Sequence, residues 1–151
     1  MSVSRVVVVG AGLAGLQTVV ALRAQGFAGG LTLVGAEDEA PYDRPPLSKA
    51  LLAGATDGTT LEADWSALDT DLRISTTVAS VGDGVVATDQ GGLPFDGLVL
   101  ATGAQPRRLA GADSALTLRT RADAAGHPSQ GLARRRGARP GLSRRHRRRQ
   151  T

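Results

Sequence analysis

Cysteine is absent from this 151-residue sequence, and its two histidines, His127 and His146, both lie beyond residue 125. Residues 1–125 therefore hold neither a thiol nor an imidazole, which excludes Ser-His-Asp catalysis, Cys-His catalysis and Cys/His zinc sites from that part. A redox-active disulfide is excluded as well. Because the absence of cysteine is compatible with a reducing compartment, we expect a cytoplasmic protein with no membrane partner.

Acidic residues are absent from residues 126–151, which instead hold nine arginines. Residues 1–125 contain all 14 acidic residues and nine basic ones, so that part carries a net charge of −5. The overall charge of +4 is therefore the sum of an acidic domain and a basic tail. The length suits one domain, and we predict its boundary near residue 125.

The first 34 residues predict a strand, a glycine turn, a helix and a second strand. Four consecutive valines after Arg5 are typical of a strand buried on both faces of a parallel sheet. Leucine and valine then recur at helical spacing from Leu13 until Gly26, a helix stop signal, and an apolar strand follows over 31–34. A signal-peptide core over 6–16 is the alternative, but Gln17 and Thr18 interrupt the apolar run.

The rest of the acidic part predicts shorter elements. Prolines over 41–46 exclude a regular helix or central strand there. We expect a short helix over 48–53, a strand over 73–78, a hairpin pairing 81–87 with 93–95, and a buried strand over 98–101 that ends at Thr102 and Gly103.

Glycines at 10, 12 and 15 follow the first strand in the pattern of a dinucleotide-binding turn. Gly10 would make the tight turn, Gly12 would let the backbone approach a pyrophosphate, and Gly15 would let the helix pack on the strand. The helix N-terminus would supply amides to the phosphates. Glu37, at the end of the second strand, would accept hydrogen bonds from an adenosine ribose, which favours FAD or NAD over a 2′-phosphorylated nucleotide. A tight turn that binds nothing stays the alternative.

Three further segments resemble the FAD-dependent ferredoxin and rubredoxin reductases. The segments are Pro41-Tyr-Asp-Arg-Pro-Pro-Leu-Ser-Lys49, Leu98-Val-Leu-Ala-Thr-Gly-Ala-Gln-Pro-Arg107, and Leu118-Arg-Thr120 followed by Ala122-Asp-Ala124. They occur in that family's order and spacing, so the resemblance covers residues 3–125. It implies an α/β, Rossmann-like domain of the glutathione-reductase type, with a parallel sheet and a small antiparallel hairpin.

The resemblance also implies a cofactor, its contacts and an activity. The residues that it assigns to FAD are Gly10, Gly12, Leu13, Ala14, Gly15, Glu37, Arg44, Lys49, Val78, Thr102, Gly103 and Arg119. The implied reaction passes electrons from NADH or NADPH through FAD to a ferredoxin or a rubredoxin-type acceptor. Disulfide reductases with this fold carry a cysteine pair in this region, and without one the flavin itself should pass electrons onward.

Several of these residues have plainer interpretations. Lys49, expected on the short helix, would stabilise the anionic reduced flavin, but it could simply be solvated. Arg44 and Arg119 could hold phosphate in forked contacts, although Arg44 could instead pair with Asp43. The sole tryptophan, Trp65, is predicted to pack in the core rather than stack on a flavin. The Thr102-Gly103 pair could be only a turn.

The basic tail, with only four apolar residues, is predicted to be disordered. It could be a nucleic-acid arm of poor specificity, because no aromatic side chain is interleaved for base stacking, or a solvated tail without a task, and we favour neither. We favour a frameshift product, because 144–149 can be encoded as CGT CGT CAT CGG CGC CGG, which one nucleotide later reads Val-Val-Ile-Gly-Ala-Gly. That is the start of the family's second nucleotide-binding turn. The domain is accordingly expected to be incomplete, with weak FAD retention and little turnover.

Overall fold

The computed structural model describes residues 2–56, 58–108, 110–111 and 114–127. Its strands are β1 (Arg5–Val9), β2 (Gly30–Val34), β3 (Thr70–Arg73), β4 (Val78–Gly82), β5 (Val85–Thr88), β6 (Gly91–Pro94) and β7 (Gly97–Leu100). Its helices are α1 (Leu13–Ala24), the short 3₁₀ helix η1 (Pro45–Ser48), α2 (Trp65–Leu68) and α3 (Arg121–Ala125). The predicted basic tail lies outside the described residues from 128 onward.

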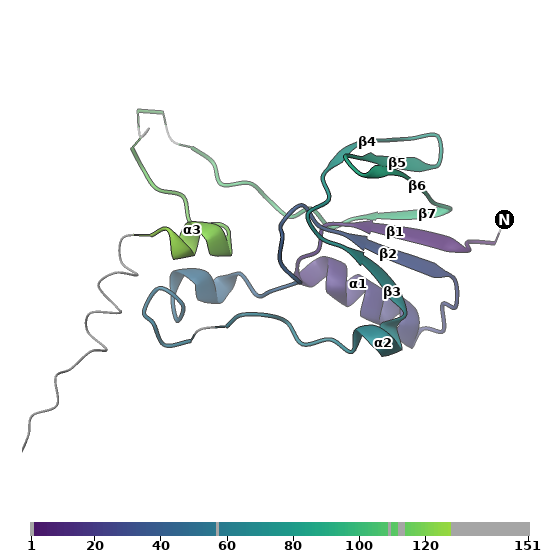
Figure 1. Cartoon of the computed structure of the whole chain (residues 1–151), viewed down its shortest axis with the longest axis horizontal. Helices are drawn as coiled ribbons and strands as arrows, with labels where there is room; N and C mark the ends of the chain where they lie inside the picture. The colour runs from purple at the N-terminus through teal and green to yellow at the C-terminus, as the bar shows by residue number, and fades with distance from the viewer. Residues whose placement is uncertain (1, 57, 109, 112–113, 128–151) are drawn as a thin grey trace, which may run out of the picture.

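Two sheets and one long helix form three layers (Figure 1). The parallel sheet has the strand order β3-β2-β1-β7, and the antiparallel sheet has the order β4-β5-β6. Figure 1 shows α1 against one face of the parallel sheet and β4 to β6 against the other. The predicted α/β class and the predicted parallel sheet are confirmed.

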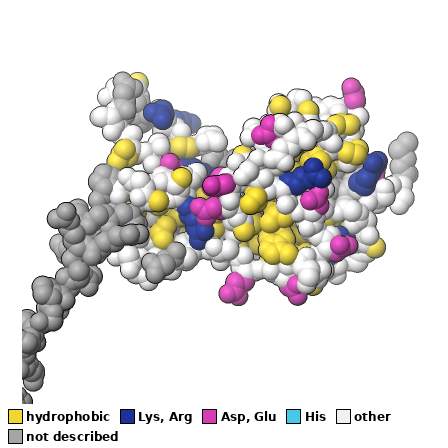
Figure 2. Space-filling view, in the orientation of Figure 1, with side chains coloured by type: hydrophobic (Ala, Val, Ile, Leu, Met, Phe, Trp, Pro, Cys, Tyr) yellow, Lys and Arg dark blue, Asp and Glu magenta, His cyan; other side chains and the backbone are white. Residues whose placement is uncertain are grey.

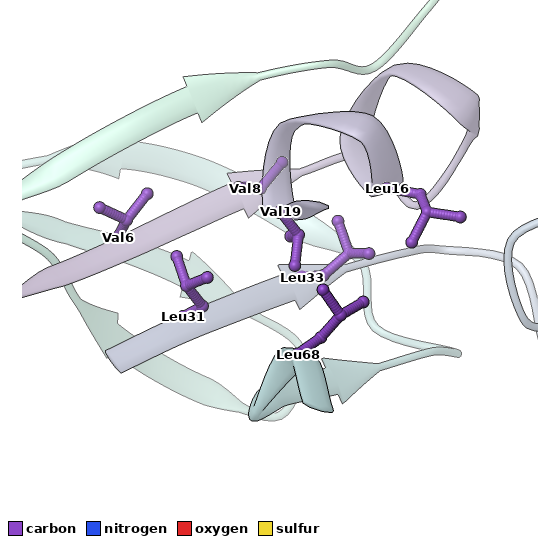
Figure 3. Packing of buried hydrophobic residues seen from close by; sticks show 7 residues of the cluster. All are labelled: Val6, Val8, Leu16, Val19, Leu31, Leu33 and Leu68. Carbon is purple, nitrogen blue, oxygen red and sulfur yellow. The ribbon is translucent and has the colours of Figure 1, made fainter. Parts of the chain in front are cut away.

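The central strand β1 is buried on both faces, because its valines alternate between two cores. On the helix side, Val6 and Val8 pack with Leu33 of β2 and with residues of α1 (Figure 3). On the other side, Val7 and Val9 pack with Val86 and other residues of the antiparallel sheet. A fully buried aliphatic side chain contributes about 1.5–3 kcal/mol, so the continuous valine run stabilises both layers at once.

Trp65 packs against the helix-side core, where it is partly buried, so the expectation that it is a packing residue is confirmed. The stretch from Val6 to Leu16 runs through β1 and the start of α1. In the described part of the chain, no helix combines the length and apolar character needed to cross a membrane.

The strand predicted over 73–78 is wrong, because β3 ends at Arg73 and β4 begins only at Val78. Ser75 between them adopts a left-handed backbone conformation with φ of 49°, which turns the chain from one sheet into the other. Threonine and valine favour extended backbone in either case. Local preference therefore did not reveal the change of sheet.

The predicted hairpin is a three-stranded antiparallel sheet instead. Asp83 and Gly84 both have positive φ, 49° and 72°, and divide the predicted strand 81–87 into β4 and β5. Two positive φ angles in Asp-Gly are typical of the tight hairpin turn that matches strand twist. The Asp83-Gly84 pair, which indicates such a turn, was present in the sequence. The pairing of β5 with β6 agrees with the prediction, with Val86 opposite Leu93.

Asp96 ties the chain ahead of β7 to the start of β1. Its Oδ2 accepts hydrogen bonds from the Ser4 amide at 3.1 Å, the Ser4 hydroxyl at 2.6 Å and the Arg5 amide at 2.9 Å. Hydrogen bonds from Ser4 and Arg5 hold the pKa of this carboxyl well below its usual range. The ionised carboxylate therefore stabilises the folded state above the unfolded pKa, and that contribution disappears as pH falls through the folded pKa.

We expect Asp96→Asn to lower the urea midpoint at neutral pH and to differ progressively less from the wild type below about pH 4. The measurement is urea unfolding of both proteins across the acid range. Asp38→Asn, at an exposed aspartate, controls for removal of one negative charge. A deficit of Asp96→Asn that is constant at every pH would contradict the prediction.

Candidate functional site

A pocket of about 580 Å³ opens at the carboxyl ends of β1, β2 and β7. The chain proceeds from β1 to β2 on one side and later returns to β7 on the other, so the crossovers diverge at β1. Ligands of open parallel sheets bind at such a switch point. The walls are formed by the turns that follow the three strands and by residues near the start of β4, Thr76 to Val78.

The glycines in and after the first turn differ in what surrounds them: two lie against other backbone atoms, and one lies beside open space. Gly10 has φ of 111°, and a Cβ there would lie 2.2 Å from the Ala101 carbonyl oxygen. A Cβ at Gly15 would lie 1.9 Å from the Gly10 oxygen. At Gly12, by contrast, a Cβ would meet no described atom within 4 Å. Gly10 and Gly15 therefore allow close contact between backbone segments, whereas Gly12 leaves open space beside the pocket that it lines.

The N-terminus of α1 faces this pocket with Leu13 and Ala14. The helix has no side-chain cap and no acidic residue in its first turn, and its first internal hydrogen bond runs from the Leu16 amide to the Gly12 oxygen at 3.0 Å. The amides before Leu16 have no carbonyl partner within the helix. Such amides, together with the helix dipole, suit a phosphate group.

Glu37 follows β2 and is held by two donors from the proline-rich segment. The Tyr42 hydroxyl donates to its Oε2, and Arg44 Nη2 donates to its Oε1. Burial, together with the hydrogen bond to Glu37, raises the pKa of Tyr42 to about 12. The phenol therefore stays protonated at neutral pH and remains a donor. Arg44 also donates through Nη1 to the Arg119 carbonyl at 2.8 Å, so the alternative pairing with Asp43 does not occur.

Gly103 and Arg119 also line the pocket. Gly103 has φ of 71°, and a Cβ there would lie 2.9 Å from Arg119 Nη2. The backbone of Arg119 is fixed by Asp123, whose Oδ2 accepts from the amides of Arg119 and Thr120 at 2.8 Å each. These two backbone hydrogen bonds lower the pKa of Asp123. Asp123 thereby caps α3 and anchors Arg119 beside the pocket.

Most residues selected from the sequence meet in this pocket. Those that line it are Gly10, Gly12, Leu13, Ala14, Glu37, Arg44, Val78, Thr102, Gly103 and Arg119. Gly15 lies beneath the turn as a packing residue. Lys49 is exposed and does not line the pocket. Their assignment to a cofactor stays a prediction.

The short helix predicted to carry Lys49 over 48–53 is wrong. The 3₁₀ helix η1 ends at Ser48, and Lys49 has φ of −125° and ψ of −97°, which are not helical. Proline at the first two positions of η1 starts the turn earlier than the apolar pattern suggests. Lys49 therefore lacks the predicted helical support.

Tyr42 and Thr76 line the pocket but were not selected from the sequence. Tyr42 lay within the segment that carried the family resemblance, and its hydrogen bond to Glu37 was not foreseen. Thr76 is buried and its amide donates to the Gly35 oxygen at 2.9 Å. No local sequence pattern indicated Thr76, because it reaches the pocket only where the chain crosses from β3 in one sheet to β4 in the other.

Comparison with known proteins gives consistent matches. Residues 4–138 match the pyridine nucleotide-disulphide oxidoreductase family. The ferredoxin–NAD(+) reductase component of the p-cumate 2,3-dioxygenase system of Pseudomonas putida is 41% identical over 133 residues, which are 82% of this chain and 33% of that protein. Putidaredoxin reductase of Pseudomonas putida is 39% identical over 118 residues, which are 74% of this chain and 28% of that protein.

Solved structures give the same result. The structure of a covalent putidaredoxin reductase–putidaredoxin complex matches with a TM-score of 0.75 and 36% identity, over 87% of this chain and 34% of that one. The crystal structure of Fdr9 matches with a TM-score of 0.76 and 42% identity, over 81% of this chain and 32% of that one. The chain thus spans about a third of the length of these curated relatives and solved structures.

Proposed function

Because this chain belongs to the pyridine nucleotide-disulphide oxidoreductase family, we propose that it forms the FAD-binding part of a ferredoxin reductase. In this proposal, NADH or NADPH is the electron donor and a ferredoxin or rubredoxin-type iron–sulfur protein is the acceptor. It is supported by the similar proteins, which include a ferredoxin–NAD(+) reductase component, a rubredoxin–NAD(+) reductase and putidaredoxin reductase. We also propose a cytoplasmic location, with which the absence of cysteine is compatible.

The observation that carries the proposal is the open cradle at Gly12 between the α1 N-terminus and Glu37. The cradle fits an ADP group in three respects. Its amides suit a pyrophosphate, the free space at Gly12 allows close approach, and the Glu37 carboxylate can accept from ribose hydroxyls. FAD contains such a group, so the residues present fit the ADP half of this cofactor.

The residues on the β7 side of the pocket would serve the rest of the molecule. We assign Thr102, Gly103 and Arg119, which line the pocket after β7 and before α3, to the part that borders the flavin half. Arg119 would place a permanent positive charge beside the cofactor. Val78 would supply an apolar surface at the start of β4.

Bound FAD would supply a flavin ring that accepts a hydride from NAD(P)H and returns electrons singly. This chain's own residues would bind and orient the cofactor and exclude water around it. None of them need act as a proton carrier, and without cysteine none can act as a dithiol. Lys49 is exposed, so a direct role for it beside the flavin has no geometric support in this structure.

The test is a titration of the purified 151-residue protein with FAD, followed by flavin fluorescence and absorbance. We expect FAD to bind at least about tenfold more tightly than FMN, since FMN lacks the ADP group that the cradle would hold. ADP should compete with FAD. Equal affinities for FAD and FMN, or no binding of either, would rule out the proposal. Binding of ADP and NADH without preference for FAD would favour a noncatalytic adenine-nucleotide module.

A further inference from the structure

Arg121, the first residue of α3, has its guanidinium fixed by three acceptors from the preceding part of the chain. Its Nη1 donates to Glu39 Oε2, its Nε to the Thr59 hydroxyl at 3.0 Å, and its Nη2 to the Thr60 hydroxyl at 3.0 Å. The acceptors surround the planar group in one arrangement. A lysine ammonium, as a point charge on a flexible stem, would not reproduce this set of contacts.

The fixed guanidinium of Arg121 lies over the ring of Tyr42, with its Cζ 5.1 Å from the ring centroid. The backbone amide of Arg121 also donates to the Tyr42 hydroxyl at 3.3 Å. Arg44 approaches the same ring, again with Cζ 5.1 Å from the centroid. Tyr42 is only 4% exposed, so the two arginines hold a buried ring and its hydroxyl in a single position.

The Tyr42 hydroxyl in turn orients the Glu37 carboxylate, to which it donates. Tyr42 occupies one lone pair of Oε2, and Arg44 occupies one lone pair of Oε1. Each carboxylate oxygen can accept a second hydrogen bond. Glu37 therefore keeps acceptor capacity on both oxygens while two donors fix its plane at the pocket wall.

Arg121 itself does not line the pocket, and no motif in the sequence selected it. Figure 2 shows acidic and basic side chains lying next to one another on the displayed face. Arg121 forms an ion pair with Glu39, and Arg44 forms one with Glu37. These contacts connect α3 to the ribose end of the pocket through one tyrosine.

We propose that Arg121 is a positioning residue that acts through Tyr42 to orient Glu37 toward the hydroxyls of an adenosine ribose. The inference rests on the proposed function, because it assumes that the pocket binds an ADP group. A positioning role of Arg121 differs from a merely structural role in one measurable respect. Loss of Arg121 should weaken recognition of the ribose hydroxyls more than it weakens binding of the rest of the nucleotide.

The test compares the affinities of ADP and 2′-deoxy-ADP for the full 151-residue protein by calorimetry. A hydrogen bond to a charged group contributes about 1.5 kcal/mol or more, so the wild type should prefer ADP by about tenfold. Arg121→Met and Tyr42→Phe should each reduce that preference to about threefold or less, and the double variant should lose little more because both act through one hydroxyl. Arg121→Lys, a milder change, provides the same measurement should Arg121→Met not fold.

Arg23→Met is the matched control. Arg23 also has its guanidinium fixed by several acceptors, namely the carbonyls of Leu68, Phe27, Gly29 and Asp69, and it lies over the Phe27 ring at 5.9 Å. It does not line the pocket. Its loss should lower stability and leave the preference for ADP over 2′-deoxy-ADP at the wild-type value.

The outcomes separate this inference from the function on which it rests. If the Arg121 variants keep the wild-type preference, or if Arg23→Met loses it equally, the inference is overturned although the proposed function stands. If the wild type binds FAD and ADP but shows no preference for ADP over 2′-deoxy-ADP, the inference is also overturned. If the wild type binds neither FAD nor ADP, both proposals are overturned together.

Discussion

Gly15→Ala should lower the free energy of unfolding by about 3 kcal/mol or more, at the upper end of what overpacking costs. The added Cβ would lie 1.9 Å from the Gly10 carbonyl oxygen and 3.1 Å from Leu33 Cδ1. Because the first of these atoms is backbone in the turn between β1 and α1, a rotamer change cannot relieve the collision. Either the helix or the turn must move away from the sheet.

Urea unfolding followed by circular dichroism measures this effect. Moving α1 would open the core in which Leu16 and Val19 of the helix pack against Val8 of β1 (Figure 3). Gly12→Ala, three residues earlier in the same turn, is the control for adding one methyl group. A Gly15→Ala protein as stable as the wild type would show that the helix does not pack on the turn as closely as described.

Gly12→Ala should have the opposite profile, with nearly unchanged stability and a loss of about ten- to a hundredfold in affinity for FAD. A Cβ at Gly12 meets no described protein atom within 4 Å, and the residue has φ of −96°, which alanine adopts without strain. The methyl group would instead occupy the space where we propose that the pyrophosphate approaches the backbone.

The measurement is an FAD titration alongside urea unfolding of the same Gly12→Ala preparation. Gly26→Ala serves as a control outside the pocket, since a Cβ there also meets nothing within 4 Å, although its φ of 84° makes that variant less stable. Unchanged FAD affinity of Gly12→Ala would remove the main support for the proposed ADP cradle. Together the two glycine variants separate the residue that supports the fold from the residue that admits the ligand.

The three strands that carry the site could be predicted from sequence because their patterns are local. The valine run of β1, the apolar segment of β2 and the segment before Thr102 each stand within a few residues of their observed bounds. Burial on two faces makes β1 continuously apolar, which distinguishes it from the surrounding turns. The last strand was predicted to be buried as well, but β7 is only partly buried and its Leu100 is 66% exposed. The glycine spacing then placed a turn and a helix N-terminus after β1.

Not every element could be predicted from the sequence. Lys49 was assigned to a helix that does not form, and the segment after Arg73 was assigned to one strand although it joins two sheets. In both places the short-range preferences were compatible with more than one structure. The boundary near residue 125 and the basic tail stay predictions, since residues 128–151 lie outside the described part.

Glycine spacing and apolar runs report local backbone requirements, so the sequence by itself indicated the α/β class, the parallel sheet and the places of Gly10, Gly12 and Glu37. The other predicted residues that line the pocket, Leu13, Ala14, Arg44, Val78, Thr102, Gly103 and Arg119, were implied by the family resemblance. Only the tertiary structure decided which side chains hold Glu37. Tyr42 and Arg121 are 79 positions apart, and neither their stacking nor the set of acceptors around Arg121 has a local pattern. Such contacts form only when the packed sheets and α3 bring distant segments together, so they cannot be predicted from residue spacing along the chain.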